Sequence, residues 1–275
     1  MANRVSALII TGYGINCEVE CEYTARKAGA DKTRIIHFSE LLTGEAKLTD
    51  HNFIIFPGGF IDGDDLGAAQ AAAQRWQYAK DASDAPLLNQ LKKFIEDDGI
   101  AIGICNGFQL MAKLGLLPAL DGRYFERQSS LVNNASARFE DRWVHLKVNR
   151  NSPCVFTRGL DKLYLPVRHG EGYFVPLDAA TRERLHRENL VVAQYAHPDT
   201  GEPTTEYPYN PNGSPQGVAA ICDPSGRLMG LMPHPEAFND PTNHPGWTRG
   251  ETATLGLKLF ENGVRYLRES KCSAA

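Results

Sequence analysis

The sequence lacks long apolar runs, an excess of charge of one sign and a compact framework of cysteines. No stretch approaches the roughly 18 apolar residues of a membrane-spanning helix, and the apolar residues 7–10 are too few for a signal-peptide core. The 29 basic and 33 acidic residues leave a net charge of −4, so nothing electrostatic points to nucleic acid or a membrane as partner. We expect a globular, cytoplasmic α/β protein.

Six cysteines are spread along the chain without a pattern of close pairs, so we expect reduced thiols rather than disulfides. Cys17 and Cys21 are four residues apart on a predicted helix and could face a metal together. No second close pair and no His-Glu-x-x-His sequence accompanies them, so we predict no metal site. The glycine-rich loops that bind nucleotide phosphates are also absent, so no cofactor is expected on this chain.

Strand and helix patterns alternate through the first 120 residues. Apolar β-rich segments predict strands, and amphipathic or Ala-rich segments between them predict helices. The predicted strands are 5–10, 34–38, 53–56 and 100–104, and the predicted helices are 18–27, 66–80, 87–95 and 108–114. This alternation, with strands that are apolar throughout, predicts a mostly parallel sheet with helices on both faces. Ligands of such sheets bind beyond the carboxyl ends of the strands.

The second half of the chain is richer in predicted strands. They cover residues 138–148, 162–167, 190–195, 217–222 and 228–232, and a final helix is predicted at 252–268. No internal repeat or low-complexity tail divides the sequence. We predict one domain, residues 1–275, with a β-rich second half.

Cys105 stands where a predicted buried strand meets a predicted helix. Gly103 and Gly107 flank it at two residues on either side, which is the arrangement of a nucleophile elbow with cysteine in place of serine. The following helix N-terminus favours a thiolate and aims the N–H of Asn106 at an oxyanion formed there. The ordinary alternative is a buried structural cysteine at a strand end.

Two further motifs follow predicted strands. Gly58 and Gly59, in Pro57-Gly58-Gly59, would let backbone N–H groups approach an oxyanion closely. His234 and Glu236, in Pro233-His-Pro-Glu236, are two residues apart, and in an extended segment they share a side. A thiol nucleophile needs such a base and a carboxylate that orients it. Taken alone, each motif has an ordinary interpretation, a Pro-Gly turn or a surface histidine. Their occurrence together with Cys105, each at a predicted strand end, favours catalysis.

These three motifs resemble the triad-type (class I) glutamine amidotransferases, whose fold is flavodoxin-like. Segments that favour the branch of glutaminase subunits of phosphoribosylformylglycinamidine synthase are Gly14-Ile-Asn-Cys-Glu18, Val167-Arg-His-Gly-Glu-Gly172 and Asn210-Pro-Asn-Gly-Ser214. The resemblance spans nearly the whole chain. It implies that Cys105 attacks the glutamine carboxamide, that His234 and Glu236 complete the triad, and that Gly58, Gly59 and Asn106 form the oxyanion hole.

The resemblance further implies glutamine contacts by Gln109 and by the backbone of His169 and Gly170. It implies a large synthetase subunit that carries ATP and Mg²⁺ and accepts the ammonia, with a small bridging subunit in some systems. One departure is Ile61-Asp62, where the family commonly has Ser-Tyr. The acidic residues of this loop are most simply solvated, and a contact with a basic patch on the synthetase is the alternative: Asp62, Asp64 and Asp65.

Two other functions stay open from the residues alone. One is a stand-alone cysteine hydrolase or peptidase with the same elbow. The other is a non-catalytic relative that serves as a binding or regulatory module, against which the intact Cys105, His234 and Glu236 argue.

Overall fold

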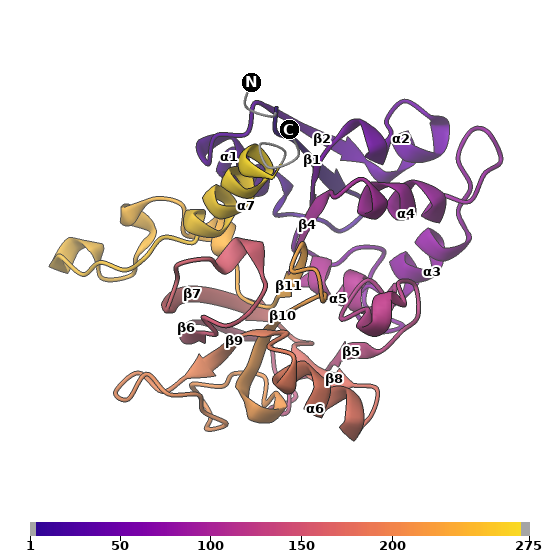
Figure 1. Cartoon of the computed structure of the whole chain (residues 1–275). Helices are drawn as coiled ribbons and strands as arrows, with labels where there is room; N and C mark the ends of the chain where they lie inside the picture. Colours follow the sequence, from indigo (N-terminus) through magenta and orange to yellow (C-terminus); the bar gives the residue numbers. More distant parts are fainter. Residues whose placement is uncertain (1–3, 271–275) are drawn as a thin grey trace.

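A nine-stranded sheet runs through the computed structural model, which describes residues 4–270 (Figure 1). The strand order is β2-β1-β3-β4-β11-β10-β9-β6-β7. The first five strands of that order pair in parallel, and the remaining pairings are antiparallel. The predicted fold class is therefore confirmed: a flavodoxin-like order 2-1-3-4 forms the parallel part, and the second half of the chain extends it.

The strands of the main sheet are β1 (Ser6–Thr11), β2 (Lys32–His37), β3 (Phe53–Phe56), β4 (Ile100–Ile104), β6 (Glu140–Val148), β7 (Lys162–His169), β9 (Val191–Ala196), β10 (Val218–Cys222) and β11 (Leu228–Leu231). A small antiparallel ribbon pairs β5 (Ser129–Val132) with β8 (Tyr173–Pro176). The helices are α1 (Glu18–Lys27), α2 (Phe38–Thr43), α3 (Gln70–Tyr78), α4 (Leu88–Glu96), α5 (Asn106–Lys113), α6 (Ala179–Arg187) and α7 (Leu257–Glu269).

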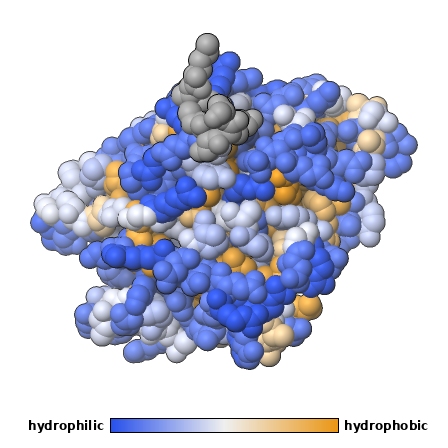
Figure 2. Space-filling model, viewed as in Figure 1, coloured by the Kyte–Doolittle hydropathy of each residue, from blue (hydrophilic) through white to orange (hydrophobic). Residues whose placement is uncertain are grey.

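Helices cover the parallel strands on both sides. Helix α1 packs against α7 on one side of the sheet, and α3 packs against α5 on the other (Figure 1). Every residue of β3, β4 and β11 is buried, which explains why these strands show no polar alternation. On the outside, the face seen in Figure 2 is mainly hydrophilic, with apolar residues in separated patches. No helix within residues 4–270 is both long and apolar enough to cross a membrane.

The bounds of α1, β3 and β4 agree with the sequence prediction, whereas α3 and α7 begin four and five residues later than predicted. Helix α3 begins at Gln70 instead of residue 66, because Gly67 and Ala69 have positive φ and the chain turns there. Helix α7 begins at Leu257 instead of residue 252. There Gly256 lies so close to the Pro235 carbonyl that a Cβ would sit 2.2 Å from that oxygen. The short elements α2, α6, β5 and β8 were not predicted.

The carboxyl ends of four adjacent parallel strands lie at one edge of the sheet. Strands β1, β3, β4 and β11 are neighbours in that order, and their following loops carry Cys17, Gly58, Cys105 and His234 respectively. The topology alone thus brings together residues that are up to 217 positions apart in the chain. This edge is where ligands of open α/β sheets bind.

Candidate active site

Cys105 forms a strained turn between β4 and α5. Its backbone has φ 50° and ψ −103°, a conformation that a residue with a side chain rarely adopts. The turn is fixed at both sides, because the Cys105 N–H donates to the carbonyl of Leu231 at 2.8 Å and its carbonyl accepts from the N–H of Gln109 at 3.0 Å. The structure therefore has the elbow that the sequence predicts, with the thiol at the helix N-terminus.

The flanking glycines are required by close packing rather than by their own φ angles. A Cβ at Gly107 would lie 1.9 Å from the carbonyl oxygen of Phe56, and a Cβ at Gly103 would lie 2.5 Å from the sulfur of Met111. Helix α5, which follows Cys105, thus packs directly on the end of β3. This contact places the elbow against the loop that carries Gly58 and Gly59.

We expect the substitution Gly107→Ala to destabilise the protein by about 3 kcal/mol or more, because backbone must move to admit the methyl group. Urea unfolding measures the change. A matched control is Gly122→Ala, where no atom lies within 4 Å of the added Cβ and only a positive φ of 70° opposes the substitution, at about 1–2 kcal/mol. Equal losses for the two variants would show that the packing at the elbow is looser than the structure indicates.

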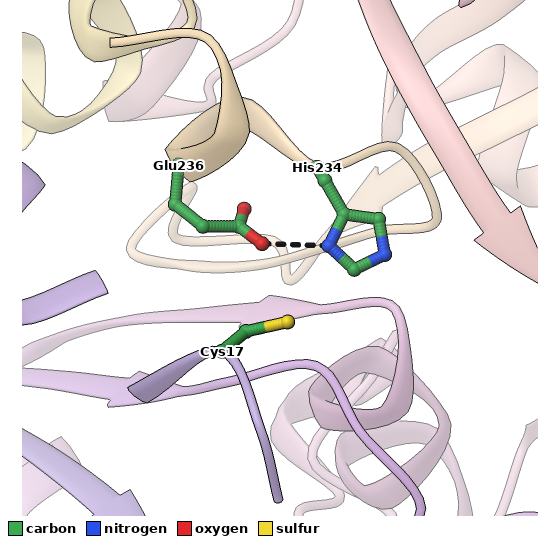
Figure 3. Close-up of side chains that lie close together, drawn as sticks. All are labelled: Cys17, His234 and Glu236. Atoms are coloured by element: carbon green, nitrogen blue, oxygen red, sulfur yellow. Dashed lines mark hydrogen bonds and ion pairs between the residues drawn. The ribbon is translucent and has the colours of Figure 1, made fainter. Parts of the chain in front are cut away.

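His234 and Glu236 form a buried pair beyond the end of β11. The Nδ1 atom of His234 and the Oε1 atom of Glu236 are 2.6 Å apart (Figure 3), and the two side chains are 3% and 1% exposed. Glu236 reaches the ring from a 3₁₀ turn, Pro235–Ala237, so the predicted extended geometry is wrong although the predicted contact is confirmed. The N–H of His234 donates to the Pro166 carbonyl, which holds the segment against β7.

The imidazole is positioned and charged as a base for a thiol. Burial lowers the pKa of His234, but the negative charges of Glu236 and of a Cys105 thiolate outweigh burial and raise the pKa well above its ordinary value. The Nδ1 side faces the carboxylate, and Nε2 has no hydrogen-bond partner among the described residues. A proton taken from Cys105 can therefore reside on this ring as part of a thiolate–imidazolium pair.

A cavity of about 250 Å³ opens onto these groups. Cys105, His234 and Glu236 line it together, so the structure brings the predicted triad to one space. The cavity also has walls that the sequence analysis did not assign to the site: Asn16, Cys17, Glu20, Phe60, Phe139 and Arg168. In the sequence, some of these residues stood out only as parts of segments that resemble the family. Their position around Cys105 depends on loops that are far apart in the sequence and meet only in the fold.

The Pro-Gly-Gly loop lies against the ring of His234. Gly59 lines the cavity, and a Cβ at Gly58 would come within 2.7 Å of the Cε1 atom of His234. Glycine is therefore needed at position 58 to admit the ring. The assignment of the N–H groups of Gly58, Gly59 and Asn106 to an oxyanion hole stays a prediction.

Two other predicted glutamine contacts, Gln109 and His169, are buried and are not among the residues that line this cavity. Gln109 is 3% exposed, accepts from the amide of Asn106 at 2.9 Å and donates to the carbonyl of Glu171 at 2.5 Å. His169 is 2% exposed and bonds to Asn134, whose amide also binds the His169 carbonyl. Burial, together with the positive charge of His234, lowers the pKa of His169 to about 3 and keeps the ring neutral.

The acidic loop is less solvated than predicted. Asp62 pairs with Arg75 at 3.0 Å and its side chain is 15% exposed. Burial and the neighbouring charge of Glu171 raise the pKa of Asp64. Only Asp65 has the exposure that a solvated loop would give. This part of the loop is thus packed into the molecule: Arg75 of α3 pairs with Asp62, and Asp64 is partly buried near the carboxylate of Glu171.

A cysteine on a strand-to-helix turn, with a His–Glu pair at the same edge of a flavodoxin-like sheet, defines a triad-type thiol enzyme for acyl transfer. The model of the CobB/CobQ-like glutamine amidotransferase domain matches residues 4–267. The chain belongs to this family, and within it to the PurQ-type glutamine amidotransferases.

The curated PurQ relatives match along almost their whole length. One is the phosphoribosylformylglycinamidine synthase subunit PurQ of Methanococcus maripaludis strain C7, which is 41% identical over 95% of this chain and 97% of its own. The PurQ subunit of Dehalococcoides mccartyi is 40% identical over 97% and 99% of the two chains. The phosphoribosylformylglycinamidine synthase of Drosophila melanogaster is 36% identical over 84% of this chain, which corresponds to 17% of that longer protein.

Solved structures give the same fold. A chain of the PurLQS structure from Thermotoga maritima matches with a TM-score of 0.69 and 26% identity, over 96% of this chain and 100% of that chain. A glutamine amidotransferase from the same organism matches with a TM-score of 0.53 at 17% identity, which supports the fold alone.

Proposed function

We propose that this chain is the glutaminase subunit of phosphoribosylformylglycinamidine synthase, which hydrolyses glutamine and passes the ammonia to an ATP-dependent synthetase subunit in purine biosynthesis. The observation that carries the proposal is the single cavity that holds Cys105, His234 and Glu236 in a chain of the PurQ type. The expected glutamine specificity comes from the family.

The proposed reaction begins when His234 takes the thiol proton of Cys105 and the thiolate attacks the carboxamide carbon of glutamine. The resulting oxyanion would be held by backbone N–H groups of the elbow and of the Pro-Gly-Gly loop. His234 then donates its proton to the leaving nitrogen, the C–N bond breaks, and ammonia departs. Water, deprotonated by the same ring, hydrolyses the glutamyl thioester to glutamate and regenerates the thiol.

A separate acceptor is needed because ammonia in water at neutral pH is mostly protonated and a poor nucleophile. ATP and Mg²⁺ are proposed to bind the synthetase subunit, since this chain lacks the common nucleotide-binding loops. Phe60 and Phe139 line the cavity and are 45% and 54% exposed, and such apolar groups at a site's rim are typical of a surface that a partner covers. We further propose that a small subunit bridges this chain and the synthetase, and that the complex is cytoplasmic.

The proposal is tested by mixing the purified chain with the synthetase subunit, formylglycinamide ribonucleotide, ATP and Mg²⁺. We expect glutamine-dependent product formation, and a glutaminase rate that is much lower for the isolated chain than for the complex. The reason is that loops of the cavity rim are proposed to be ordered by the synthetase. Full glutaminase activity of the isolated chain would contradict gating by the partner. Peptide cleavage without glutaminase activity would favour a stand-alone hydrolase.

A further inference from the structure

Cys17 places a second thiol beside the catalytic pair. It follows β1 and is the N-cap residue of α1, and it makes no side-chain capping bond there. Its thiol instead donates to Oδ1 of Asn16 at 3.3 Å, and both residues line the cavity. Figure 3 shows the sulfur pointing toward the contact between His234 and Glu236. The potential ligand atoms of Cys17, His234 and Glu236 all lie within 4.8 Å of one another. Cys21, which the sequence pairs with Cys17, is fully buried and is not part of this group.

The backbone of Gly58 lies close to two of these atoms, because glycine leaves room there for the His234 ring. A methyl group at position 58 would lie 3.3 Å from the sulfur of Cys17 and 3.4 Å from Nδ1 of His234, so both atoms border the same small volume. The second carboxylate oxygen of Glu236 is buried and has no hydrogen-bond partner among the described residues. A sulfur, an imidazole nitrogen and an under-coordinated carboxylate thus converge, and solvent reaches them through the cavity.

We propose that Cys17, His234 and Glu236 form an inhibitory binding site for a thiophilic divalent cation, and that Zn²⁺ is the ion it binds best. Tetrahedral zinc with sulfur, nitrogen and oxygen ligands holds those atoms about 3.5 Å apart. The atoms lie within 4.8 Å of one another, and Nδ1 of His234 and Oε1 of Glu236 are 2.6 Å apart, so this hydrogen-bonded pair must separate by about 1 Å to admit the ion. Thiolate and imidazole favour zinc over Mg²⁺, which prefers oxygen ligands in octahedral geometry. The site therefore discriminates against the Mg²⁺ that the proposed synthetase uses.

Metal binding at this position stops the chemistry by a defined route. The thiol proton of Cys17 is released to solvent, and the metal takes the place of the proton that Nδ1 shares with Glu236. The remaining ring proton then resides on Nε2, so His234 has no lone pair with which to accept the proton of Cys105. The ion is an inhibitor, and the expectation that catalysis needs no metal is unaffected.

Zinc binding is measured directly on the full chain by equilibrium dialysis, which makes the test independent of the proposed purine function. We expect one zinc ion per chain, and an affinity that falls at least about 100-fold in Cys17→Ser because a direct ligand is lost. Glu20→Gln is the matched control, since Glu20 lines the same cavity but is not part of the cluster. Its zinc affinity should stay within a few-fold of the parent.

Two further measurements show whether Cys17 or Cys105 supplies the thiolate that binds the metal. Zinc should protect Cys17 of the unsubstituted protein from alkylation, as mapped by mass spectrometry. Co²⁺ as a substitute should give a thiolate charge-transfer band that persists in Cys105→Ser and disappears in Cys17→Ser. Unchanged zinc affinity in Cys17→Ser would overturn the proposal, as would loss of the band in Cys105→Ser alone, which would place the ion on the nucleophile. Absence of alkylation protection would overturn it without any substitution.

Discussion

The substitution Cys105→Ala should lower glutamine-dependent synthesis by at least about 10⁴-fold, while synthesis from added ammonium salt by the assembled complex stays unchanged. Removal of the nucleophile eliminates the thioester route, and the remaining triad members cannot replace it because they act as one unit. The two rates are measured on the same complex with glutamine or with ammonium as the nitrogen source. The thioester itself should be trapped on residue 105 of the parent by acid quenching with labelled glutamine.

Cys154→Ala serves as the matched control, because Cys154 is a buried cysteine outside the cavity, packed against Met229. It should retain most of the glutamine-dependent rate. A Cys105→Ala protein that still hydrolyses glutamine normally would remove Cys105 from the reaction. Loss of the ammonium-dependent rate as well would contradict the separation of the two activities between the two subunits.

The substitution Glu236→Gln should lower glutaminase activity by about 10³–10⁴-fold with little change in structure. The carboxylate at 2.6 Å holds the ring proton on Nδ1 and stabilises the imidazolium, and an amide of the same shape does neither reliably. Its negative charge also raises the pKa of His234, so its removal should lower that pKa. Steady-state kinetics measures the first effect, and NMR titration of the His234 ring measures the second.

The direction in which the pKa of His234 changes distinguishes a loss of the orienting carboxylate from a general loss of structure. In the parent the raised pKa keeps His234 protonated as the pH rises past the ordinary histidine range, and in Glu236→Gln the ring should lose its proton at lower pH. Glu20→Gln removes a more exposed carboxylate that lines the same cavity and should leave both the rate and the titration nearly unchanged. An unchanged His234 titration in Glu236→Gln would contradict the assignment of Glu236 as the orienting group.

The parallel strands and the elbow could be predicted because their causes are local. Strands buried on both faces must be apolar throughout, and a nucleophile elbow needs small residues beside the cysteine, so Gly103 and Gly107 mark it in the sequence. The late starts of α3 and α7 could not be predicted. They depend on the positive φ of Ala69 and on the approach of Gly256 to Pro235, which arise only when distant segments pack.

The surroundings of several polar side chains could not be predicted from the sequence either. Asp62 and Asp64 belong to an acidic run that in isolation predicts a solvated loop, yet Arg75 from α3 and Glu171 from the loop after β7 change their surroundings. Cys17 shows the same effect. Its sequence neighbour Cys21 suggests a helical pair, whereas the fold directs Cys17 to residues more than 200 positions away.

The sequence by itself determined the order of strands and helices and the chemical groups placed at the strand ends, because propensity, burial pattern and turn chemistry act over a few residues. Only the tertiary structure decided which of these groups meet. The parallel order β1-β3-β4-β11 brings four loops to one edge, and the packing of α5 on β3 sets the cavity between them. The distances that make Cys105, His234 and Glu236 one site, and Cys17 their neighbour, are properties of that long-range packing.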